Sequence, residues 1–298
     1  MERELRNIDF LDEKHLQVGD EVFAFGYPFP FEESLTTPPI LKPRELITQL
    51  ESLLLKVSPE RIIELGVNRG GSTALIASLV CPERMVAIDL SAEPSLELRR
   101  FLYERYLTNK ITTHYGIDQA DTATLADILD NAFGGAPIDF VIDDASHHYS
   151  PTRRSFELIF PRLRTGGLFV IEDWAGEHKL VAKLIDKIDR RAPGWESLWQ
   201  HIRAGLCEED RNLIPAEEEN DPRLSTLVRL AKLRVARNDV TPLSRFGLEL
   251  LCASADSLDI IRRIEVTWGF FIVERGKGEI SEGPWLDELT MDVFGALV

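Results

Sequence analysis

The fold is decided by residues 61–72, which read RIIELGVNRGGS. The first five residues form a short apolar run typical of a buried strand, and the glycines that follow open a helix-forming segment. Missing side chains at such a turn let a ligand approach the backbone, and the free N–H groups of a helix N-terminus point outward. The turn therefore predicts a binding site for a small polar ligand.

Short apolar runs and helical stretches alternate on both sides of this turn. The apolar runs predict buried parallel strands at 61–65, 85–89, 111–115, 138–142 and 168–171. Helical spacing predicts a helix of about three turns after Pro43, and further helices at 72–80, 95–107, 122–133 and 152–163. Five strands joined by four helices predict an α/β fold with a doubly wound sheet. Two further runs, 261–266 and 270–274, flank the short turn at Trp268 and Gly269 and predict a hairpin at the end of the sheet.

Two segments fall outside this pattern. Residues 1–42 mix charge with aromatic residues and prolines, which favours an arm or lid over an independent domain, so the main domain is expected to span 43–298. Residues 175–246, approximately, interrupt the alternation with amphipathic helical patterns and predict a helical insertion. We expect this insertion to shape the ligand pocket or to form a contact in a homo-oligomer. Its scattered basic residues are interpreted as a solvated helix face.

Composition and charge exclude several classes of protein. The 298 residues are 44% hydrophobic and 28% charged, which is typical of a globular protein and excludes disordered and fibrous classes. The net charge of −16 repels phosphate backbones and anionic lipid, so we expect neither nucleic acid nor membrane as a partner. No signal peptide or membrane-spanning run is recognisable, so a cytoplasmic location is expected. Cys81, Cys207 and Cys252 are odd in number and widely spaced, which argues against disulfides and a cysteine zinc site.

The glycine-rich turn differs from the two common phosphate-binding loops. A dinucleotide fingerprint would need glycine where Asn68 stands, and the lysine of a phosphate-binding loop is absent. Asp89 ends the second predicted strand, where an acidic residue bonds ribose hydroxyls in nucleoside-binding sheets. Together these features favour a nucleoside without a pyrophosphate. The alternative is that Gly70 and Gly71 only permit close packing of helix on strand, and that Asp89 is a turn residue.

Acidic and histidine side chains follow the fourth and fifth predicted strands. Residues 138–148 read IDFVIDDASHH, and residues 171–173 read IED. Because the carboxyl ends of parallel strands meet at one edge of a sheet, these side chains are expected to lie close together. Four acids in such a space repel unless a proton or a cation lies among them, and carboxylate oxygens suit Mg²⁺. The sequence therefore predicts a divalent-metal site at this edge.

Other interpretations of this cluster remain open. Asp143 could serve only to stabilise the loop, and His148 could cap the following helix. An iron site made by Asp144, His147 and His148 is a further alternative, although adjacent histidines in a short loop rarely face one centre. Ser146 lacks the surroundings of a hydrolase nucleophile, because no G-x-S-x-G pattern is present.

Three motifs in this order resemble a known family. Residues 64–73 (ELGVNRGGST), 142–149 (IDDASHHY) and 166–174 (GGLFVIEDW) are similar to class I S-adenosylmethionine-dependent methyltransferases. The closest resemblance is to the metal-dependent group that contains macrolide-sugar O-methyltransferases and cephalosporin-hydroxylase-like proteins, and it covers about 43–173 and 258–276. It implies a Rossmann-like, mostly parallel seven-stranded sheet. The family usually carries glycine where Ala145 stands, a change that is tolerated if φ is not positive there.

The resemblance also implies roles for individual residues. Glu64 and Gly66 would face the methionine part of S-adenosylmethionine, Asp89 its ribose, and Asp118 with Gln119 the rim near the adenine. The full cofactor-binding set is expected to be Glu64, Gly66, Asn68, Gly70, Ser72, Asp89, Asp118, Gln119 and Asp143. Asp144, Glu172 and Asp173 would bind Mg²⁺, and His147 with Asp144 would be the catalytic residues, His147 as the base.

The implied function is a Mg²⁺-dependent O-methyltransferase. Its acceptor would be a hydroxyl of a small molecule, a sugar or polyol of a natural product. The alternative is a methyltransferase-like fold that binds the nucleoside but serves as a scaffold or regulatory subunit without catalysis, because a fold by itself does not fix a function.

Overall fold

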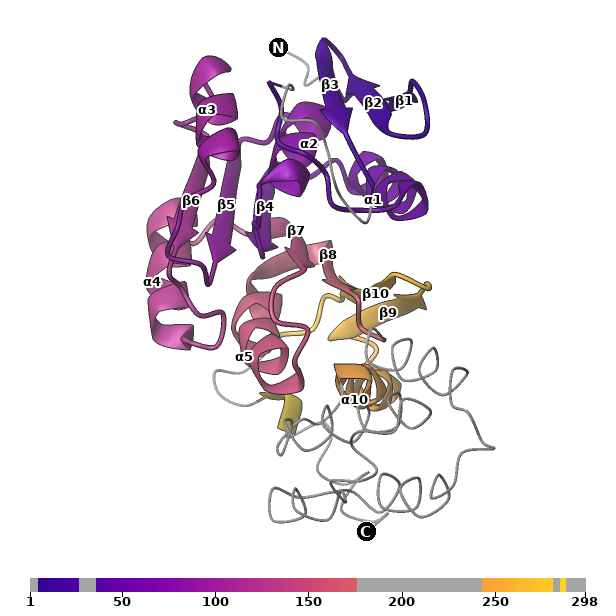
Figure 1. Cartoon of the computed structure of the whole chain (residues 1–298). Coiled ribbons are helices and arrows are strands. Elements are labelled where there is room, and N and C mark those ends of the chain that lie inside the picture. The colour runs from indigo at the N-terminus through magenta and orange to yellow at the C-terminus, as the bar shows by residue number, and fades with distance from the viewer. Residues whose placement is uncertain (1–4, 27–35, 176–242, 281–284, 288–298) are drawn as a thin grey trace, which may run out of the picture. The chain divides into compact units, whose positions relative to one another are not determined.

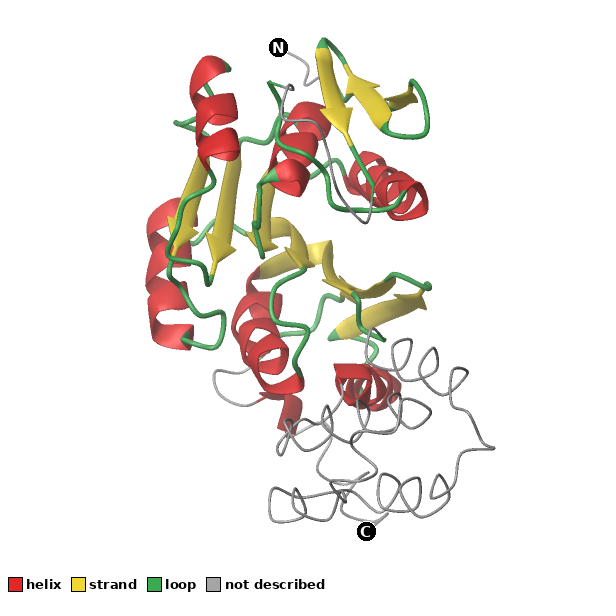
Figure 2. Ribbon diagram, viewed as in Figure 1, coloured by secondary structure: helices red, strands yellow, loops and turns green. Residues whose placement is uncertain are grey.

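The computed structural model describes residues 5–26, 36–175, 243–280 and 285–287 (Figures 1 and 2). The chain divides into two compact units, Met1–Trp174 with Phe246–Val298, and Ala175–Arg245. Nearly all of the second unit, and with it the predicted helical insertion, lies outside the described residues. In the part of the chain that is described, no helix has the length and apolar character needed to cross a bilayer.

A seven-stranded sheet forms the centre of the first unit. Its strand order is β6-β5-β4-β7-β8-β10-β9. The strands are β4 (Arg61–Leu65), β5 (Arg84–Asp89), β6 (Ile111–Tyr115), β7 (Ile138–Asp143), β8 (Leu163–Glu172), β9 (Ile261–Val266) and β10 (Phe270–Arg275). Neighbours from β6 to β8 pair in parallel, and β10 runs antiparallel to both β8 and β9. The doubly wound, mostly parallel sheet and its terminal hairpin are therefore confirmed.

The helices begin where the sequence supplies a suitable first residue. They are α1 (Arg44–Val57), α2 (Gly71–Val80), α3 (Leu96–Glu104), α4 (Thr122–Phe133), α5 (Tyr149–Ile159) and α10 (Leu243–Asp256). Pro43 precedes α1 with an extended backbone, and its fixed φ suits the start of a helix. The side chains of Ser95 and Asp121 accept backbone N–H groups of α3 and α4, which satisfies donors that have no partner within the helix.

Apolar layers cover both faces of the sheet. One core combines residues of α1, α2 and α3 with strand residues such as Phe140 and Ile142. The other face contains an aromatic cluster centred on Phe156 of α5, whose ring lies 4.9 Å from that of Phe169 in β8 and 5.3 Å from that of Phe246 in α10. Because strand residues alternate between the two faces, burial of the whole of β7 follows from helices packing on both sides.

The N-terminal arm has a small sheet of its own. Strands β1 (Asp9–Phe10), β2 (His15–Val18) and β3 (Glu21–Ala24) pair antiparallel, and β2 and β3 contact α2 (Figure 1). A further bridge joins Phe25 to Ile40, and the carbonyl of Pro39 lies against Gly71 at the start of α2. The role of the arm as a lid stays a prediction.

Two predicted helices had wrong boundaries. The helix expected at 152–163 begins at Tyr149 and ends at Ile159, because Pro161 lies in a separate 3₁₀ turn (Phe160–Arg162) and the chain then enters β8 at Leu163. The helix expected at 95–107 ends at Glu104, where the backbone turns toward Tyr106 with a positive φ of 56°.

Candidate functional site

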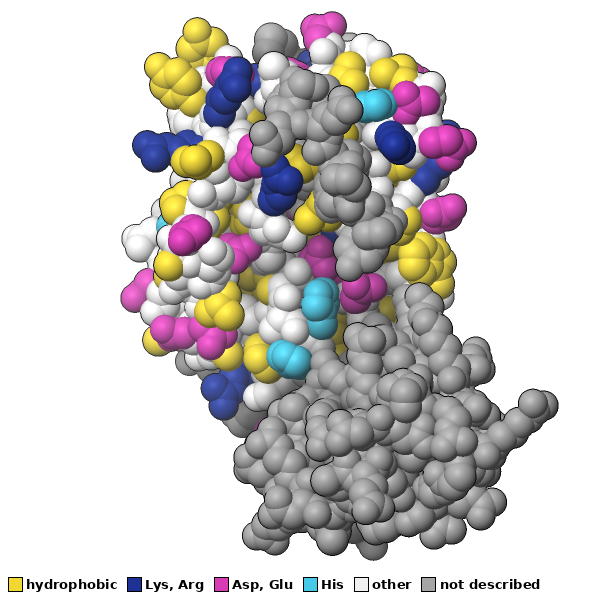
Figure 3. All heavy atoms as spheres, viewed as in Figure 1, with side chains coloured by type: hydrophobic (Ala, Val, Ile, Leu, Met, Phe, Trp, Pro, Cys, Tyr) yellow, Lys and Arg dark blue, Asp and Glu magenta, His cyan; other side chains and the backbone are white. Residues whose placement is uncertain are grey.

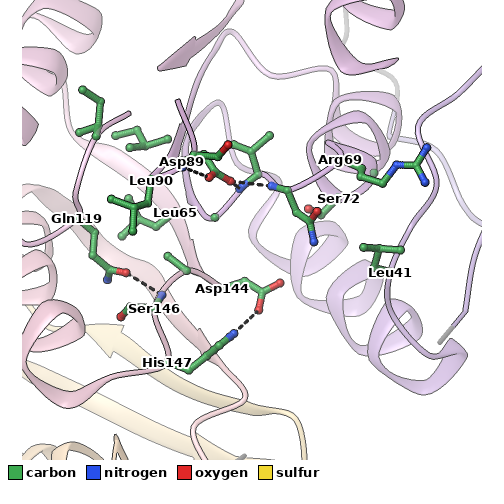
Figure 4. A pocket seen from close by; sticks show the side chains of 18 of the residues that line it. Leu41, Leu65, Arg69, Ser72, Asp89, Leu90, Gln119, Asp144, Ser146 and His147 are labelled. Atoms are coloured by element: carbon green, nitrogen blue, oxygen red, sulfur yellow. Dashed lines mark hydrogen bonds and ion pairs between the residues drawn. The ribbon is translucent and has the colours of Figure 1, made fainter. Parts of the chain in front are cut away.

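A cavity of about 510 Å³ opens at the carboxyl ends of β4, β5 and β7 (Figure 4). Six of the nine predicted cofactor-binding residues line it, namely Gly66, Asn68, Ser72, Asp89, Asp118 and Gln119. Asp144 and His147 line the same cavity. The structure thus brings the nucleoside-type turn and part of the acidic cluster to one space, as expected for ligand binding in an open α/β sheet.

The glycines of the turn after β4 allow three close backbone approaches. A side chain at Gly66, whose φ is +91°, would overlap the carbonyl oxygen of Asp144, and one at Gly70 would overlap Leu98 of α3. A side chain at Gly71 would overlap the carbonyl of Pro39 in the arm. Gly70 does not line the cavity, so the packing interpretation holds for this residue, whereas Gly66 and Gly71 lie at the cavity wall.

The Asp89 carboxylate holds the turn through backbone N–H groups. Its Oδ2 accepts the N–H groups of Val67 at 2.8 Å and Asn68 at 2.7 Å, and its Oδ1 accepts the N–H of Ser91 at 2.7 Å (Figure 4). A carboxylate has room for about four hydrogen bonds, so it retains capacity for a ligand hydroxyl. Asp89 is therefore both the turn residue of the alternative interpretation and a residue of the cavity wall.

Gln119 connects the rim of the cavity to the interior. Its Nε2 donates to Asp143 Oδ2 at 3.0 Å and to Ser155 Oγ at 3.1 Å, while its Oε1 accepts the N–H of Ser146 at 3.0 Å. Asp143 is buried and does not line the cavity. Burial raises the pKa of Asp143 to about 6, although the N–H of Ala145 and the Gln119 amide stabilise the carboxylate. Its observed contacts fit the loop-stabilising interpretation.

Glu64 lies beneath the turn rather than at the cavity wall. It is buried, and its carboxylate accepts the hydroxyl of Ser72 and, at 2.5 Å, that of Thr73. Burial raises the pKa of Glu64 to about 7 despite both hydroxyls. Ser72 lines the cavity and Glu64 does not, so Glu64 is connected to the cavity wall by its hydrogen bond with the Ser72 hydroxyl.

Lys42, which belongs to none of the motifs that predict the site, lies between two of the predicted metal ligands. Lys42 Nζ is 2.6 Å from Asp144 Oδ2 and 2.6 Å from Glu172 Oε2. The side chains are 6%, 26% and 5% exposed, respectively. Burial by itself would lower the pKa of Lys42, but the two carboxylates outweigh it and the pKa is raised. One ammonium for two carboxylates leaves one negative charge in excess, and burial together with Asp144 raises the pKa of Glu172.

His147 faces Asp144 across the mouth of the cavity. Its Nε2 lies 3.8 Å from Asp144 Oδ1, and its side chain is 41% exposed (Figure 4). Figure 3 shows histidine and acidic side chains adjoining one another near the middle of this face. His148 is the N-cap residue of α5, but its side chain makes no capping hydrogen bond and does not line the cavity. A site that uses both histidines therefore has no support from this arrangement.

Three predicted site residues other than glycine have a positive φ. Asn68, His147 and Asp173 have φ values of 50°, 53° and 52°. Such conformations cost free energy in residues other than glycine, and they concentrate at functional sites. Ala145 does not have a positive φ, so the alanine at this position is tolerated as expected.

The donor chemistry of the cluster fits a magnesium ion. Asp144, Glu172 and Asp173 supply carboxylate oxygens, the ligands that Mg²⁺ prefers. Asp173 lies close enough to Glu172 to contribute to its raised pKa. Lys42 bonds one oxygen of each of two carboxylates, and Asp144 Oδ1 is directed toward His147. Within the described residues, no three His, Cys, Asp or Glu side chains are arranged around a common metal position.

Comparison with known proteins shows that the site lies largely within a recognised domain. Residues 63–174 match the family model of a methyltransferase domain. An 8-demethyl-8-alpha-L-rhamnosyl tetracenomycin-C 2'-O-methyltransferase of Streptomyces olivaceus is 52% identical over 56 residues, which are 19% of this chain and 14% of that protein. A mycinamicin VI 2''-O-methyltransferase of Micromonospora griseorubida is 33% identical over 120 residues, which are 38% of this chain and 27% of that protein. The chain thus covers less than a third of the length of either relative.

Among solved structures, a MycE methyltransferase from the mycinamycin biosynthetic pathway, in complex with Mg, SAH and mycinamycin VI, is 20% identical with a TM-score of 0.46. The similarity covers 79% of this chain and 51% of that one. The domain match lies on β4 to β8 and includes the turn after β4 and the cluster after β7. Residues 63–174 are therefore a methyltransferase domain, and the sheet around them has a single antiparallel strand, β10.

Proposed function

We propose that this chain is an S-adenosylmethionine-dependent O-methyltransferase that methylates a hydroxyl of a sugar or polyol in a small natural product. The observation that carries the proposal is one cavity that joins Asp89 and the glycine-rich turn to the Asp144–His147 pair. Similarity to two enzymes named as O-methyltransferases of a rhamnosyl tetracenomycin and of mycinamicin VI supports the class of acceptor.

The cofactor would lie along the carboxyl ends of β4 and β5. Gly66, Asn68 and Ser72 would receive its methionine part, because small or polar groups at a helix start leave N–H groups accessible. Asp89 would bond the ribose hydroxyls with its remaining acceptor capacity, and Asp118 with Gln119 would bound the adenine. Glu64, Gly70 and Asp143 would support these residues from beneath.

His147 would act as the base at the acceptor end of the cavity. Its Nε2 takes the proton of the acceptor hydroxyl, and Asp144 Oδ1, 3.8 Å away, stabilises the imidazolium that results. When bound, S-adenosylmethionine would supply an electrophilic methyl group to the acceptor oxygen and would leave as S-adenosylhomocysteine. Mg²⁺, held by Asp144, Glu172 and Asp173, would lower the pKa of the acceptor hydroxyl when bound. Holding both reactants in one cavity would supply much of the remaining rate enhancement.

Two measurements test the proposal. Calorimetric titration with S-adenosylhomocysteine should show binding in the micromolar range, whereas NAD should not bind. Incubation with S-adenosylmethionine and a panel of glycosylated natural products should give a product heavier by one methylene group, and a chelator should abolish its formation. Binding of NAD without binding of S-adenosylhomocysteine would overturn the assignment. Binding of S-adenosylhomocysteine without turnover on any acceptor would favour the scaffold alternative.

A further inference from the structure

Lys42 is a buried cation in direct contact with Asp144, and neither the glycine-rich turn nor the histidine motif contains it. Its ammonium bonds Asp144 and Glu172 at 2.6 Å each, and only 6% of its side chain is exposed. Two carboxylates at the ends of β7 and β8 would repel each other strongly in this buried position without a cation between them. Lys42 therefore supplies the charge that the sequence analysis assigned to a metal ion.

The backbone holds Lys42 in this place from both sides. Upstream, the Ile40 N–H donates to Ala24 O at 2.8 Å and the Gly26 N–H donates to Ile40 O at 3.1 Å, which anchors the segment to β3 and the residues after it. Downstream, Pro43 is the N-cap residue of α1. The carbonyl of Pro39 occupies the space left by the missing side chain of Gly71. The position of the ammonium is thus set by the fold and not by a freely moving surface chain.

We infer that Lys42 is the resident cation of the Asp144–Glu172 pair, and that a divalent metal ion competes with it for these carboxylates. This inference rests on the proposed function for the identity of the metal site. Lys42 is bonded to one oxygen of each carboxylate, so an ion that uses both groups fully must displace the ammonium from at least one of them. The folded site would then not need a metal for stability, and metal affinity would be set by the strength of the lysine contacts.

Replacement of Lys42 tests this competition without any measurement of methyl transfer. Lys42→Met removes the charge and keeps the length, and Lys42→Gln keeps a hydrogen-bond donor without the charge. Removing one partner of a buried ion pair leaves an uncompensated charge, so Tm in chelator should fall by about 5–15 °C in Lys42→Met. Millimolar Mg²⁺ should recover most of this loss, whereas wild-type Tm should be nearly the same in chelator and in Mg²⁺.

Metal affinity of the otherwise ligand-free protein gives the second readout. Titration with Mn²⁺, followed by electron paramagnetic resonance, should show at least tenfold tighter binding in Lys42→Met and Lys42→Gln than in wild type. Lys277→Met is the matched control. Lys277 is exposed, its Nζ lies 3.7 Å from Asp259 Oδ1, and neither residue lines the cavity. This substitution should change neither Tm in chelator nor Mn²⁺ affinity.

Three outcomes would overturn the inference. Mn²⁺ affinity equal to or weaker than wild type in both Lys42 variants would show that the lysine does not compete. A Tm loss that Mg²⁺ does not recover would make Lys42 a purely structural residue. A wild-type protein that loses as much Tm in chelator as the variant would make the metal the resident cation. If Lys42→Met does not fold, Lys42→Gln decides by the same criteria. A failure of methyl transfer would contradict the proposed function. It would not change the Tm and Mn²⁺ measurements, which test the inference about Lys42.

Discussion

Carboxylates at two places along the carboxyl edge of the sheet are stabilised in different ways. At the end of β5, Asp89 is held by three backbone N–H groups, which orient the carboxylate without neutralising it. At the ends of β7 and β8, Asp144 and Glu172 are held by the ammonium of Lys42, which neutralises charge and can be exchanged for another cation. The first arrangement suits recognition of hydroxyl groups, and the second suits chemistry in which charge moves. We call these two regions the turn region (residues 64–72 and Asp89) and the charge cluster (Lys42, Asp144, His147, Glu172 and Asp173).

The largest expected effect separates chemistry from cofactor binding. His147→Ala should lower turnover by about 10²–10⁴-fold, because a positioned base contributes this much. The affinity for S-adenosylhomocysteine should stay within a few-fold of wild type, since the turn region is intact. The loss should shrink at high pH, where hydroxide replaces the imidazole. Steady-state kinetics and calorimetry on the same preparation measure both quantities.

His148→Ala is the control for this prediction. His148 is adjacent in sequence but does not line the cavity, so its loss should change turnover only slightly. A His147→Ala enzyme with a near-normal rate would show that the imidazole is structural. A matching loss of cofactor affinity would break the proposed division between the two regions.

Gly66 joins the two regions, and its replacement should disturb both. Gly66→Ala places a methyl group against the carbonyl of Asp144 at a φ of +91°, so we expect a loss of about 2–4 kcal/mol in the free energy of unfolding. Gly134→Ala is the matched control, because Gly134 also has a positive φ of 57° but no atom within 4 Å of the added group. It should cost only about 1 kcal/mol. Urea unfolding curves measure both, and equal losses would remove the steric argument for contact between the regions.

Loss of the Asp89 carboxylate should lower cofactor affinity in the turn region and leave metal affinity in the charge cluster unchanged. Asp89→Ala leaves three backbone N–H groups without their acceptor and removes the proposed ribose contact, so affinity for S-adenosylhomocysteine should fall by about 1–3 kcal/mol. Asp89→Asn keeps one acceptor oxygen and should lose less. Mn²⁺ affinity should not change in either variant. A parallel fall in metal affinity would show that the regions are not independent.

Most of the sheet could be predicted from the sequence because its strands are short apolar or β-rich runs, and the central ones, β4, β5 and β7, are buried on both faces. β4, β6 and β9 have the predicted limits, and β5, β7 and β10 differ by one residue at one end. β8 begins five residues before the predicted strand, because Thr165, Gly166 and Gly167 resemble a turn while the backbone continues in the sheet. The N-terminal sheet was missed because its strands are short and its stability depends on packing against α2.

The site residues were predictable where a motif follows a strand, and not where a distant segment enters the site. Gly66, Asp144 and His147 follow strands of the sheet, Asp89 is the last residue of one, and all four line the cavity. Lys42 lies 102 residues from Asp144 in the chain, and its burial depends on how the arm packs. A lysine before a helix proline resembles an exposed residue, so no local pattern indicates its role. The roles of Glu64, Gly70 and Asp143 as supporting residues likewise depend on side-chain direction rather than on spacing.

The expected effect that is smallest between neighbouring measurements is the pH dependence of stability from Glu64, which lies under the turn region. Its pKa is raised to about 7 by burial, above the ordinary value of 4.5. Between these values the folded state binds one proton more than the unfolded chain does, so the free energy of unfolding should fall as pH rises, by up to about 1.4 kcal/mol per pH unit. Glu64→Gln removes this contribution, so the variant should gain stability relative to wild type from pH 4.5 to pH 7 and keep that gain above it. Thr108→Ala, an exposed and uncharged position, should differ from wild type by the same amount at every pH. Urea unfolding at half-unit pH steps measures the three curves, and parallel curves for Glu64→Gln and wild type would show that Glu64 carries its charge as easily in the folded protein as in the unfolded chain.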